Sequence, residues 1–293
     1  MIKIERLNDS AKLRLKFNST KESKTILLIS DVHFDSVKCN RKALKKLLDE
    51  AVERDAYIMI FGDLLDVMGA KYDPRSGKSD IRPEYNSSNY FELVLNDIVQ
   101  FFGPYADRIL MISKGNHEDS VKRRHEFDLL SIMEYKMRME YKWEGLIEGY
   151  EGWLLFSGEY KPEGEKSNKR AGGGKSFGTI KTYYTHGSGG NAPVTRGVIQ
   201  TNRRQVQIQA DMFISGHIHT QWAVPVPQRR VTDLGVEEVK EVIHLQLGCF
   251  KESHRGSWEA QKGFGASNIG GYWLKFYVGQ NQRIRCIEER TMI

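Results

Sequence analysis

Two patterns in the sequence predict an α/β fold. Five short apolar runs have the composition of buried parallel strands, and segments with apolar residues at helical spacing separate the first four of them. Beyond residue 219 the chain becomes rich in strand-like segments, which predicts a second sheet packed against the first. We expect a single domain over residues 1–293, because the polar clusters that end the five runs have to meet.

The expected elements follow in chain order. Polar and apolar residues partly alternate over residues 2–17, which suits an early strand or hairpin. The five strands are expected at 26–29, 57–61, 109–112, 182–184 and 212–214, with amphipathic helices at 41–54, 91–102 and 126–143. Residues 69–89 and 161–178 have the turn-forming composition of loops. The strands expected within 239–288 would complete the second sheet, outside a motif core of about 25–222.

The composition excludes several classes of protein. A hydrophobic fraction of 40% with 28% charged residues is ordinary for a globular protein, and no apolar stretch approaches the roughly 18 residues of a membrane span. The N-terminus lacks the apolar core of a secretory signal, so we expect a cytoplasmic protein without a membrane role. The 3 cysteines form no Cys-x-x-Cys pair, which argues against a disulfide framework and a thiolate zinc site. A net charge of +6 favours polyanionic partners without identifying one.

Each of the five apolar runs ends in a polar cluster. The clusters are Asp-Val-His at 31–33, Gly-Asp-Leu-Leu-Asp at 62–66, Gly-Asn-His-Glu at 115–118, Thr-His-Gly at 185–187 and Gly-His-Ile-His at 216–219. Open α/β sheets bind ligands beyond the carboxyl ends of their strands, so these clusters are expected to converge there. One buried histidine after a strand is more often a core residue, but five clusters together indicate a site. Their imidazole and oxygen donors suit manganese, iron, zinc or nickel, and a pair of such ions favours hydrolysis at phosphorus.

In this order, the five motifs resemble the calcineurin-like metallophosphoesterase family, over about residues 25–222. The resemblance implies a metallophosphoesterase-like four-layer αββα sandwich of two mixed β-sheets flanked by helices. It also implies two divalent transition-metal ions, with Mn²⁺ favoured and Fe, Zn, Ni or Co as alternatives. By the residue roles of the family, one ion would bind Asp31, His33 and His219, the other would bind Asn116, His186 and His217, and Asp63 would bridge them.

His117 and Asp66 are the expected catalytic residues. By the resemblance, His117 would face the substrate and protonate or stabilise the leaving oxygen, a task that suits an imidazole. Asp66 and Glu118 would orient ligand imidazoles or His117. The alternative for both carboxylates is a solvated or helix-capping position.

Two further residues are expected near the substrate. A helix over 195–210 would place Arg196, Arg203 and Arg204 on roughly one face. Arg196 is nearest to His186 in the sequence and is the one expected to meet a phosphate, while a solvated charged face is favoured for the other two. His254 lies in a polar loop and would border the site, although an exposed loop imidazole is the favoured alternative.

The favoured function is a two-metal phosphodiesterase acting on nucleic acid or a nucleotide, with a metal-bridging hydroxide as the nucleophile. The His-x-His ending at 217–219 and Asp66 resemble the diesterase and nuclease branch of the family. Eukaryotic-type Ser/Thr phosphatases carry an Asp-Arg-Gly extension, which Asp66-Val67-Met68 lacks. A phosphomonoesterase or Ser/Thr protein phosphatase is the alternative. A non-catalytic scaffold of the same fold is the least favoured, because no ligand position is damaged.

The expected partner is therefore a phosphoester substrate such as DNA, RNA or a nucleotide. No dedicated DNA-binding module is visible in the sequence, which limits the case for a nuclease. The natural substrate, exo- or endonucleolytic action and the oligomeric state stay open at this point.

Overall fold

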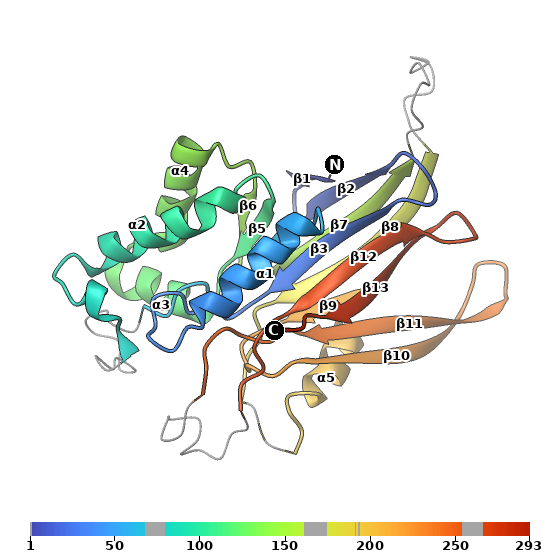
Figure 1. The fold of residues 1–293 in the computed structure, drawn as a ribbon. Coiled ribbons are helices and arrows are strands. Elements are labelled where there is room, and N and C mark those ends of the chain that lie inside the picture. The colour runs from blue at the N-terminus through green and yellow to red at the C-terminus, as the bar shows by residue number, and fades with distance from the viewer. Residues whose placement is uncertain (1, 68–79, 161–174, 191, 193, 254–265) are drawn as a thin grey trace.

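The computed structural model describes residues 2–67, 80–160, 175–190, 192, 194–253 and 266–293 (Figure 1). Its strands are β1 (Ile2–Arg6), β2 (Ala11–Phe17), β3 (Ser23–Ile29), β4 (Tyr57–Phe61), β5 (Ile109–Ser113), β6 (Leu146–Glu148), β7 (Glu151–Tyr160), β8 (Lys175–Thr185), β9 (Met212–Ser215), β10 (Trp222–Val231), β11 (Glu237–Gln246), β12 (Tyr272–Val278) and β13 (Ile284–Arg290). Its α-helices are α1 (Arg41–Glu53), α2 (Tyr90–Phe102), α3 (Asn116–His125), α4 (Leu129–Tyr141) and α5 (Ile199–Gln207), with the short 3-10 helices η2 (Pro83–Tyr85) and η3 (Gly103–Tyr105). No helix among these residues is both long enough and apolar enough to cross a membrane.

The strands form two sheets that pack face to face. One sheet has seven strands in the order β1-β2-β7-β8-β9-β11-β10, and the other has six in the order β13-β12-β3-β4-β5-β6. Leu13 and Leu154 of the first sheet share a buried apolar cluster with Leu28 and Phe276 of the second. Burial of this apolar surface holds the two sheets together.

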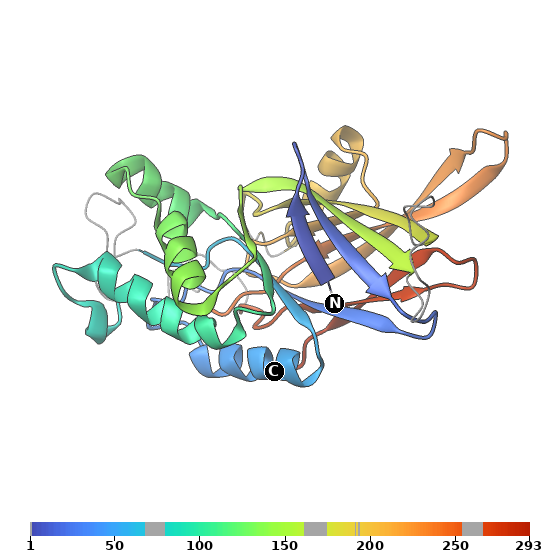
Figure 2. The same ribbon diagram turned by 90° about the horizontal axis from the view of Figure 1, so that it is seen from above.

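Helices cover the outer faces, which makes four layers. α1, α2 and α4 pack on the six-stranded sheet, where Leu48, Ile98 and Met133 share a buried cluster with Ile60 and Ile112 of the strands. Figure 2 shows α5, in yellow-orange, on the opposite side of the strands from the blue helix α1. The expected four-layer αββα sandwich of two mixed sheets is confirmed, and a single helix forms its fourth layer in the described part of the chain.

The helices begin and end where local side chains cap them. α1 begins after Asn40, whose side-chain oxygen accepts from the Ala43 N–H at 2.8 Å. The helix expected at 126–143 is α4, and it begins later than expected. Glu126 has a φ of 54°, which ends α3, and the Asp128 side chain then caps α4 by accepting from the Ser131 N–H at 3.3 Å.

The expectation that the strands within 239–288 complete the second sheet is wrong for two of the three. β11 lies in the seven-stranded sheet, but β12 and β13 extend the six-stranded sheet, where β12 runs antiparallel to β3. The reason lies in the side chains of β12. Trp273 contributes to the cluster under the helices, whereas Leu274 and Phe276 contribute to the cluster between the sheets. Beside β3, the helices cover one face of β12 and the other sheet covers its second face, so both of its apolar faces are buried there.

The two expected loops fall partly outside the described residues. Of 69–89, the described part contains η2, and of 161–178, the described part is the beginning of β8. The early hairpin expected at 2–17 is present as β1 and β2, which pair antiparallel.

Candidate metal centre

The clusters that follow the apolar strands lie at one edge of the two sheets. β3, β4 and β5 run parallel in one sheet, and β8 and β9 run parallel in the other. In the first sheet, the Asp31 N–H donates to Gly62 O at 3.1 Å. In the second, the Gly216 N–H donates to His186 O at 2.9 Å. The His217 N–H donates to Asp31 Oδ2 at 2.8 Å, which joins a loop of one sheet to a loop of the other.

Five of the seven expected ligands have a backbone conformation that L-amino acids rarely adopt. The φ angles of Asp31, His33, Asp63, His217 and His219 lie between 47° and 76°. Such residues cost on the order of 1–3 kcal/mol each, and they cluster at active sites and ligand clamps. The backbone alone therefore marks this edge as functional, independently of the side-chain chemistry.

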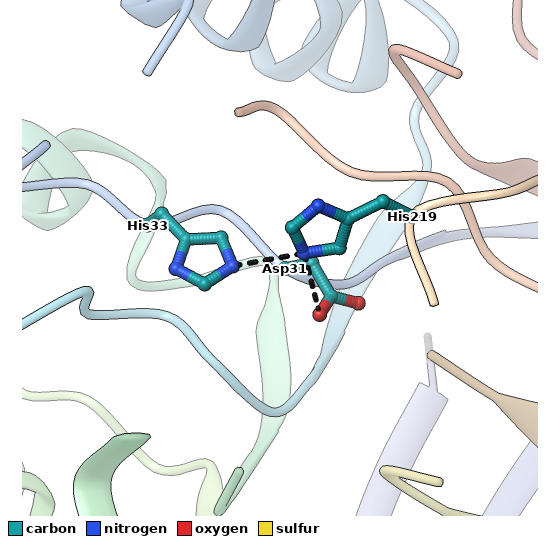
Figure 3. Close-up of side chains that lie close together, drawn as sticks. All are labelled: Asp31, His33 and His219. Carbon is teal, nitrogen blue, oxygen red and sulfur yellow. Dashed lines mark hydrogen bonds and ion pairs between the residues drawn. The ribbon is translucent and has the colours of Figure 1, made fainter. Parts of the chain in front are cut away.

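Asp31, His33 and His219 form the first group of donors (Figure 3). His33 Nε2 lies 3.1 Å from His219 Nε2, and the same His219 nitrogen lies 3.4 Å from Asp31 Oδ1. Burial opposes the ionisation of Asp31, but the charge of His186 and the hydrogen bond of His219 lower the pKa of Asp31 to about 2. One carboxylate and two imidazoles thus face one another, which is a donor set for a transition-metal ion.

Asp63, His186 and His217 form the second group, and their donor atoms lie within 4.8 Å of one another. His186 Nε2 lies 3.1 Å from Asp63 Oδ2, while His186 Nδ1 donates to Phe61 O at 3.1 Å. Because a carbonyl only accepts, this bond fixes a proton on Nδ1 and directs Nε2 toward the centre. Burial opposes the charge of His186, but the charges of Asp63 and Asp31 raise its pKa to about 10. The two carboxylates therefore favour a cation at this place.

Two of the ligands expected for the second ion have donor atoms that lack a partner. Asn116 Oδ1 and His217 Nδ1 are buried and make no hydrogen bond to any residue that the structure describes. A buried polar atom without a partner costs about 1–3 kcal/mol. A metal ion would supply the missing partner, so these residues fit a metal site.

Two glycines leave room for Asp63 and His186 to lie close together. A Cβ on Gly115 would lie 2.1 Å from Asp63 Oδ1, and a Cβ on Gly62 would lie 2.3 Å from His186 Nδ1. A donor atom of Asp63 lies within 4.8 Å of one from His33 and, on the other side, of one from His186. Asp63 thus lies near donor atoms of both groups.

His117 faces the same centre from the first turn of α3. Its Nδ1 donates to Asp66 O at 2.5 Å, and its backbone N–H donates to Asp63 Oδ1 at 3.0 Å. Its Nε2 lies 3.7 Å from Asp63 Oδ2, and its side chain is 12% exposed. The ring packs edge-on against His33, with 4.9 Å between the centroids. Since Nδ1 is bonded to a carbonyl, Nε2 is the nitrogen that can meet a substrate.

Asp66 contacts a ligand histidine rather than the space in front of it. Asp66 Oδ1 lies 2.8 Å from His33 Nδ1 and accepts from Lys251 Nζ at 2.8 Å. Burial opposes the charge, but the hydrogen bond of His33 and the charge of Lys251 hold the pKa of Asp66 well below its usual range. An ionised Asp66 keeps the proton of His33 on Nδ1 and leaves Nε2 as the ligand atom. Asp66 is thus a positioning residue.

Glu118 forms hydrogen bonds with the backbone of two loops rather than with an imidazole. Its carboxylate accepts from the Leu65 N–H and the Gly115 N–H, each at 2.9 Å. Burial and then the negative charge of Asp63 raise the pKa of Glu118 to about 7. Of the two roles considered for Glu118, the geometry shows the capping of α3.

The sequence analysis missed two buried charged residues, Lys251 and Asp35. Lys251 holds Asp66 from the far end of the chain, where no motif marks it. Asp35 accepts from the Asp66 N–H at 2.6 Å, from the Val67 N–H at 2.9 Å and from the Tyr90 hydroxyl. Asp35 follows His33 by two residues, so its position just after the first cluster was a signal that could have found it.

The structure shows neither Arg196 nor His254, the two residues expected to contact the substrate, in contact with the metal ligands. His254 lies within 254–265, outside the described residues. Arg196 precedes α5, has an exposed side chain, and accepts from Trp222 Nε1 through its carbonyl at 2.9 Å. Its contact with a phosphate stays a prediction. Arg203 and Arg204 line a cavity of about 190 Å³ beside the second donor group; Arg203 is exposed, as expected for a solvated face, whereas Arg204 is half-buried.

Comparison with known proteins agrees with this geometry. A family model described as calcineurin-like phosphoesterase matches residues 24–221. The chain belongs to this family. The calcineurin-like phosphoesterases depend on metal ions, and the His and Asp groups of this phosphoesterase could hold them.

Several solved structures resemble this phosphoesterase. A predicted phosphoesterase from Streptococcus pneumoniae is 12% identical and covers 92% of this chain and 99% of its own, with a TM-score of 0.31. A metallophosphoesterase from Sphaerobacter thermophilus is 14% identical over 92% of this chain and 89% of its own, with a TM-score of 0.38. The zinc complex of Vps29 from Entamoeba histolytica is 11% identical over 91% and 98%, with a TM-score of 0.28. No curated protein matches the sequence.

Proposed function

We propose that this phosphoesterase hydrolyses phosphodiesters, in nucleic acid or in a nucleotide, with two divalent metal ions. The observation that carries the proposal is the convergence of six of the seven expected ligands at one edge of the sheets, five of them with strained backbones. Mn²⁺ is the favoured ion because the donors are imidazole nitrogens and carboxylate or amide oxygens, without a thiolate. Fe, Zn, Ni and Co are the alternatives.

Each ion would have its own set of ligands. One ion would be held by Asp31, His33 and His219, the other by Asn116, His186 and His217, and Asp63 would contact both. Once bound, the ions would lower the pKa of a water and neutralise charge on the phosphoryl oxygens. The chain itself fixes the ligand imidazoles, His186 through Phe61 O and His33 through Asp66.

His117 would act on the leaving group. Its Nδ1 is fixed by Asp66 O, its backbone is fixed by Asp63, and its side chain is still partly exposed. Nε2 would therefore donate a hydrogen bond or a proton to the leaving oxygen as the bond to phosphorus breaks. General acid catalysis of this kind contributes about 10²–10⁴-fold to a rate.

Three features favour a diester over a monoester. The His-x-His ending at 217–219 resembles the diesterase branch of the family, and the net charge of +6 favours polyanions. The cavity lined by Arg203 and Arg204 lies next to the second donor group, so a substrate that extends beyond the reacting phosphorus has room there.

A substrate panel tests the proposal. Bis(p-nitrophenyl) phosphate, p-nitrophenyl phosphate, single- and double-stranded DNA and a phosphopeptide would be assayed with added Mn²⁺. Turnover of the bis-aryl diester and of DNA is expected, and turnover of the monoester or phosphopeptide alone would overturn the choice of a diester.

Two aspartate variants serve as controls for the panel. Asp63→Ala should abolish turnover, whereas Asp233→Ala, at an exposed position between β10 and β11, should not. If wild type binds no metal, or if Asp63→Ala is as active as wild type, a non-catalytic scaffold would explain the fold better.

A further inference from the structure

A cavity of about 190 Å³ opens beside the second donor group. Gly216, which directly precedes His217, lines it, and so does Ser188, which follows His186 by two residues. Pockets that enclose a whole drug-sized ligand measure about 300–1,000 Å³. This smaller cavity therefore suits one group of a larger substrate whose reacting part lies at the metal ligands.

One face of α5 forms a polar wall of the cavity. Gln200, Arg203 and Arg204 line it, and their spacing of three and four residues places them on the same side of the helix. α5 is attached to the seven-stranded sheet, where His244 Nε2 donates to Gln205 Oε1 at 3.1 Å. The two guanidinium groups thus extend from a supported helix, which holds them more precisely than a loop would.

Arg204 is a half-buried cation without a counter-ion from the described chain. Other half-exposed arginines are paired, as Arg41 is with Asp97 at 2.8 Å. No carboxylate in the described residues forms an ion pair with Arg204, and its ionisable neighbours include the phenols of Tyr150 and Tyr183 and the imidazole of His244, whose pKa burial lowers to about 4. Phenols are neutral near pH 7. Burial lowers the pKa of Arg204, but a guanidinium stays protonated in proteins, so its charge would attract an anion into the cavity.

We infer that this cavity binds a second phosphate of the substrate, next to the phosphoester that is cleaved. A guanidinium presents paired N–H groups that match two phosphate oxygens. The Gln200 amide and the Ser188 hydroxyl line the same cavity and supply further donors. The inference rests on the proposed hydrolysis of diesters and adds the substrate class, a diester with another phosphate nearby, as in an oligonucleotide. In a dinucleoside diphosphate the bond cleaved beside the second phosphate would be an anhydride instead.

Matched substrates test the inference. A thymidine dinucleotide with phosphates at both ends would be compared with the same dinucleotide without them. Wild type should have the higher kcat/KM for the phosphorylated form. Arg204→Gln should reduce that preference about tenfold to hundredfold, mainly through KM, because it removes a hydrogen bond between charged groups. Arg204→Lys keeps the charge but loses the planar fork and should lie between the two.

Arg229→Gln is the matched control. Arg229 pairs with Glu237 on the β10–β11 hairpin, outside the cavity, and its replacement should leave the preference unchanged. A preference that is the same in wild type and in Arg204→Gln would overturn the inference. Repeating the comparison with a dinucleoside diphosphate identifies the source of the phosphate, because KM should rise in Arg204→Gln for the substrate that reaches the cavity.

A binding measurement separates this inference from the proposed function. Inorganic phosphate, titrated calorimetrically into metal-free protein in EDTA, should bind wild type at least tenfold more tightly than Arg204→Gln. If no diester is hydrolysed but phosphate binding still depends on Arg204, the proposed function fails and the anion site stands. If diesters are hydrolysed and neither phosphate binding nor substrate preference depends on Arg204, the inference alone fails.

Discussion

Replacing Asp66 by asparagine should weaken both metal binding and the fold, for separate reasons. Asp66 Oδ1 lies 2.8 Å from His33 Nδ1 and 2.8 Å from Lys251 Nζ. The side chains of Asp66 and Lys251 are only 2% and 10% exposed. Asparagine keeps the shape of the side chain but removes its charge. His33 then loses a charged acceptor and faces an amide, whose oxygen accepts more weakly and whose nitrogen does not accept at all, and Lys251 is left opposite a neutral group.

The two losses have different expected sizes. Removing the outer hydrogen bond of a ligand histidine lowers metal affinity about 10–100-fold, or about 1.4–2.7 kcal/mol. Breaking a buried ion pair costs about 3–5 kcal/mol, and the partial exposure of Lys251 favours the lower end, about 3 kcal/mol. Adding Lys251→Met to Asp66→Asn removes both charges of this pair. The double variant should therefore regain most of the stability but not the metal affinity.

Urea unfolding in EDTA measures the stability of the two single variants and the double variant, and calorimetric titration with Mn²⁺ measures their metal affinity. The difference between the double variant and the sum of the singles gives the coupling of the pair. If Asp66→Asn binds Mn²⁺ as wild type does, Asp66 does not orient His33. If the double variant is no more stable than Asp66→Asn, the carboxylate does not neutralise Lys251.

Three further outcomes are expected. His117→Ala should lower kcat about 10²–10⁴-fold while binding as many metal ions as wild type, and a parallel loss of metal would make it a ligand instead. Gly62→Ala should lower Tm far more than Gly178→Ala: their φ angles are 78° and 86°, but only at Gly62 would a Cβ meet an atom, His186 Nδ1 at 2.3 Å. Equal Tm values would show that backbone conformation alone matters. Burial opposes the charge of Asp128, but hydrogen bonds from two lysines lower its pKa from 3.8 to about 2. Its stabilisation is therefore present above pH 3.8 and lost as the pH falls toward 2, so Asp128→Asn should cost about 1 kcal/mol at pH 7 and little at low pH. A loss of stability that does not change with pH would contradict this.

The sequence predicts those parts of the fold that depend on local patterns. Apolar spacing locates α1 to within one residue of the expected 41–54, because one face of that helix is buried. The same pattern shows that β12 is apolar but not which sheet it joins. That choice depends on pairing with β3, and no local signal records a partner so distant in the chain.

The residues of the site also fall into those that a local sequence pattern marks and those that depend on distant contacts. The clusters that carry the expected ligands could be located because each follows a recognisable strand, as His186 follows β8. Lys251 could not, because it reaches Asp66 across a separation of 185 residues. The helical spacing of Arg203 and Arg204 shows that they share a face, but only the folded chain shows that this face lines a cavity.

Calorimetric titration of Mn²⁺ into the metal-free protein tests the central claim most directly, because Asp63 is proposed to contact two ions. Two Mn²⁺ ions per wild-type chain are expected, and fewer than two per chain of Asp63→Ala. A single ion per wild-type chain, or two ions bound with unchanged affinity by Asp63→Ala, would contradict the claim.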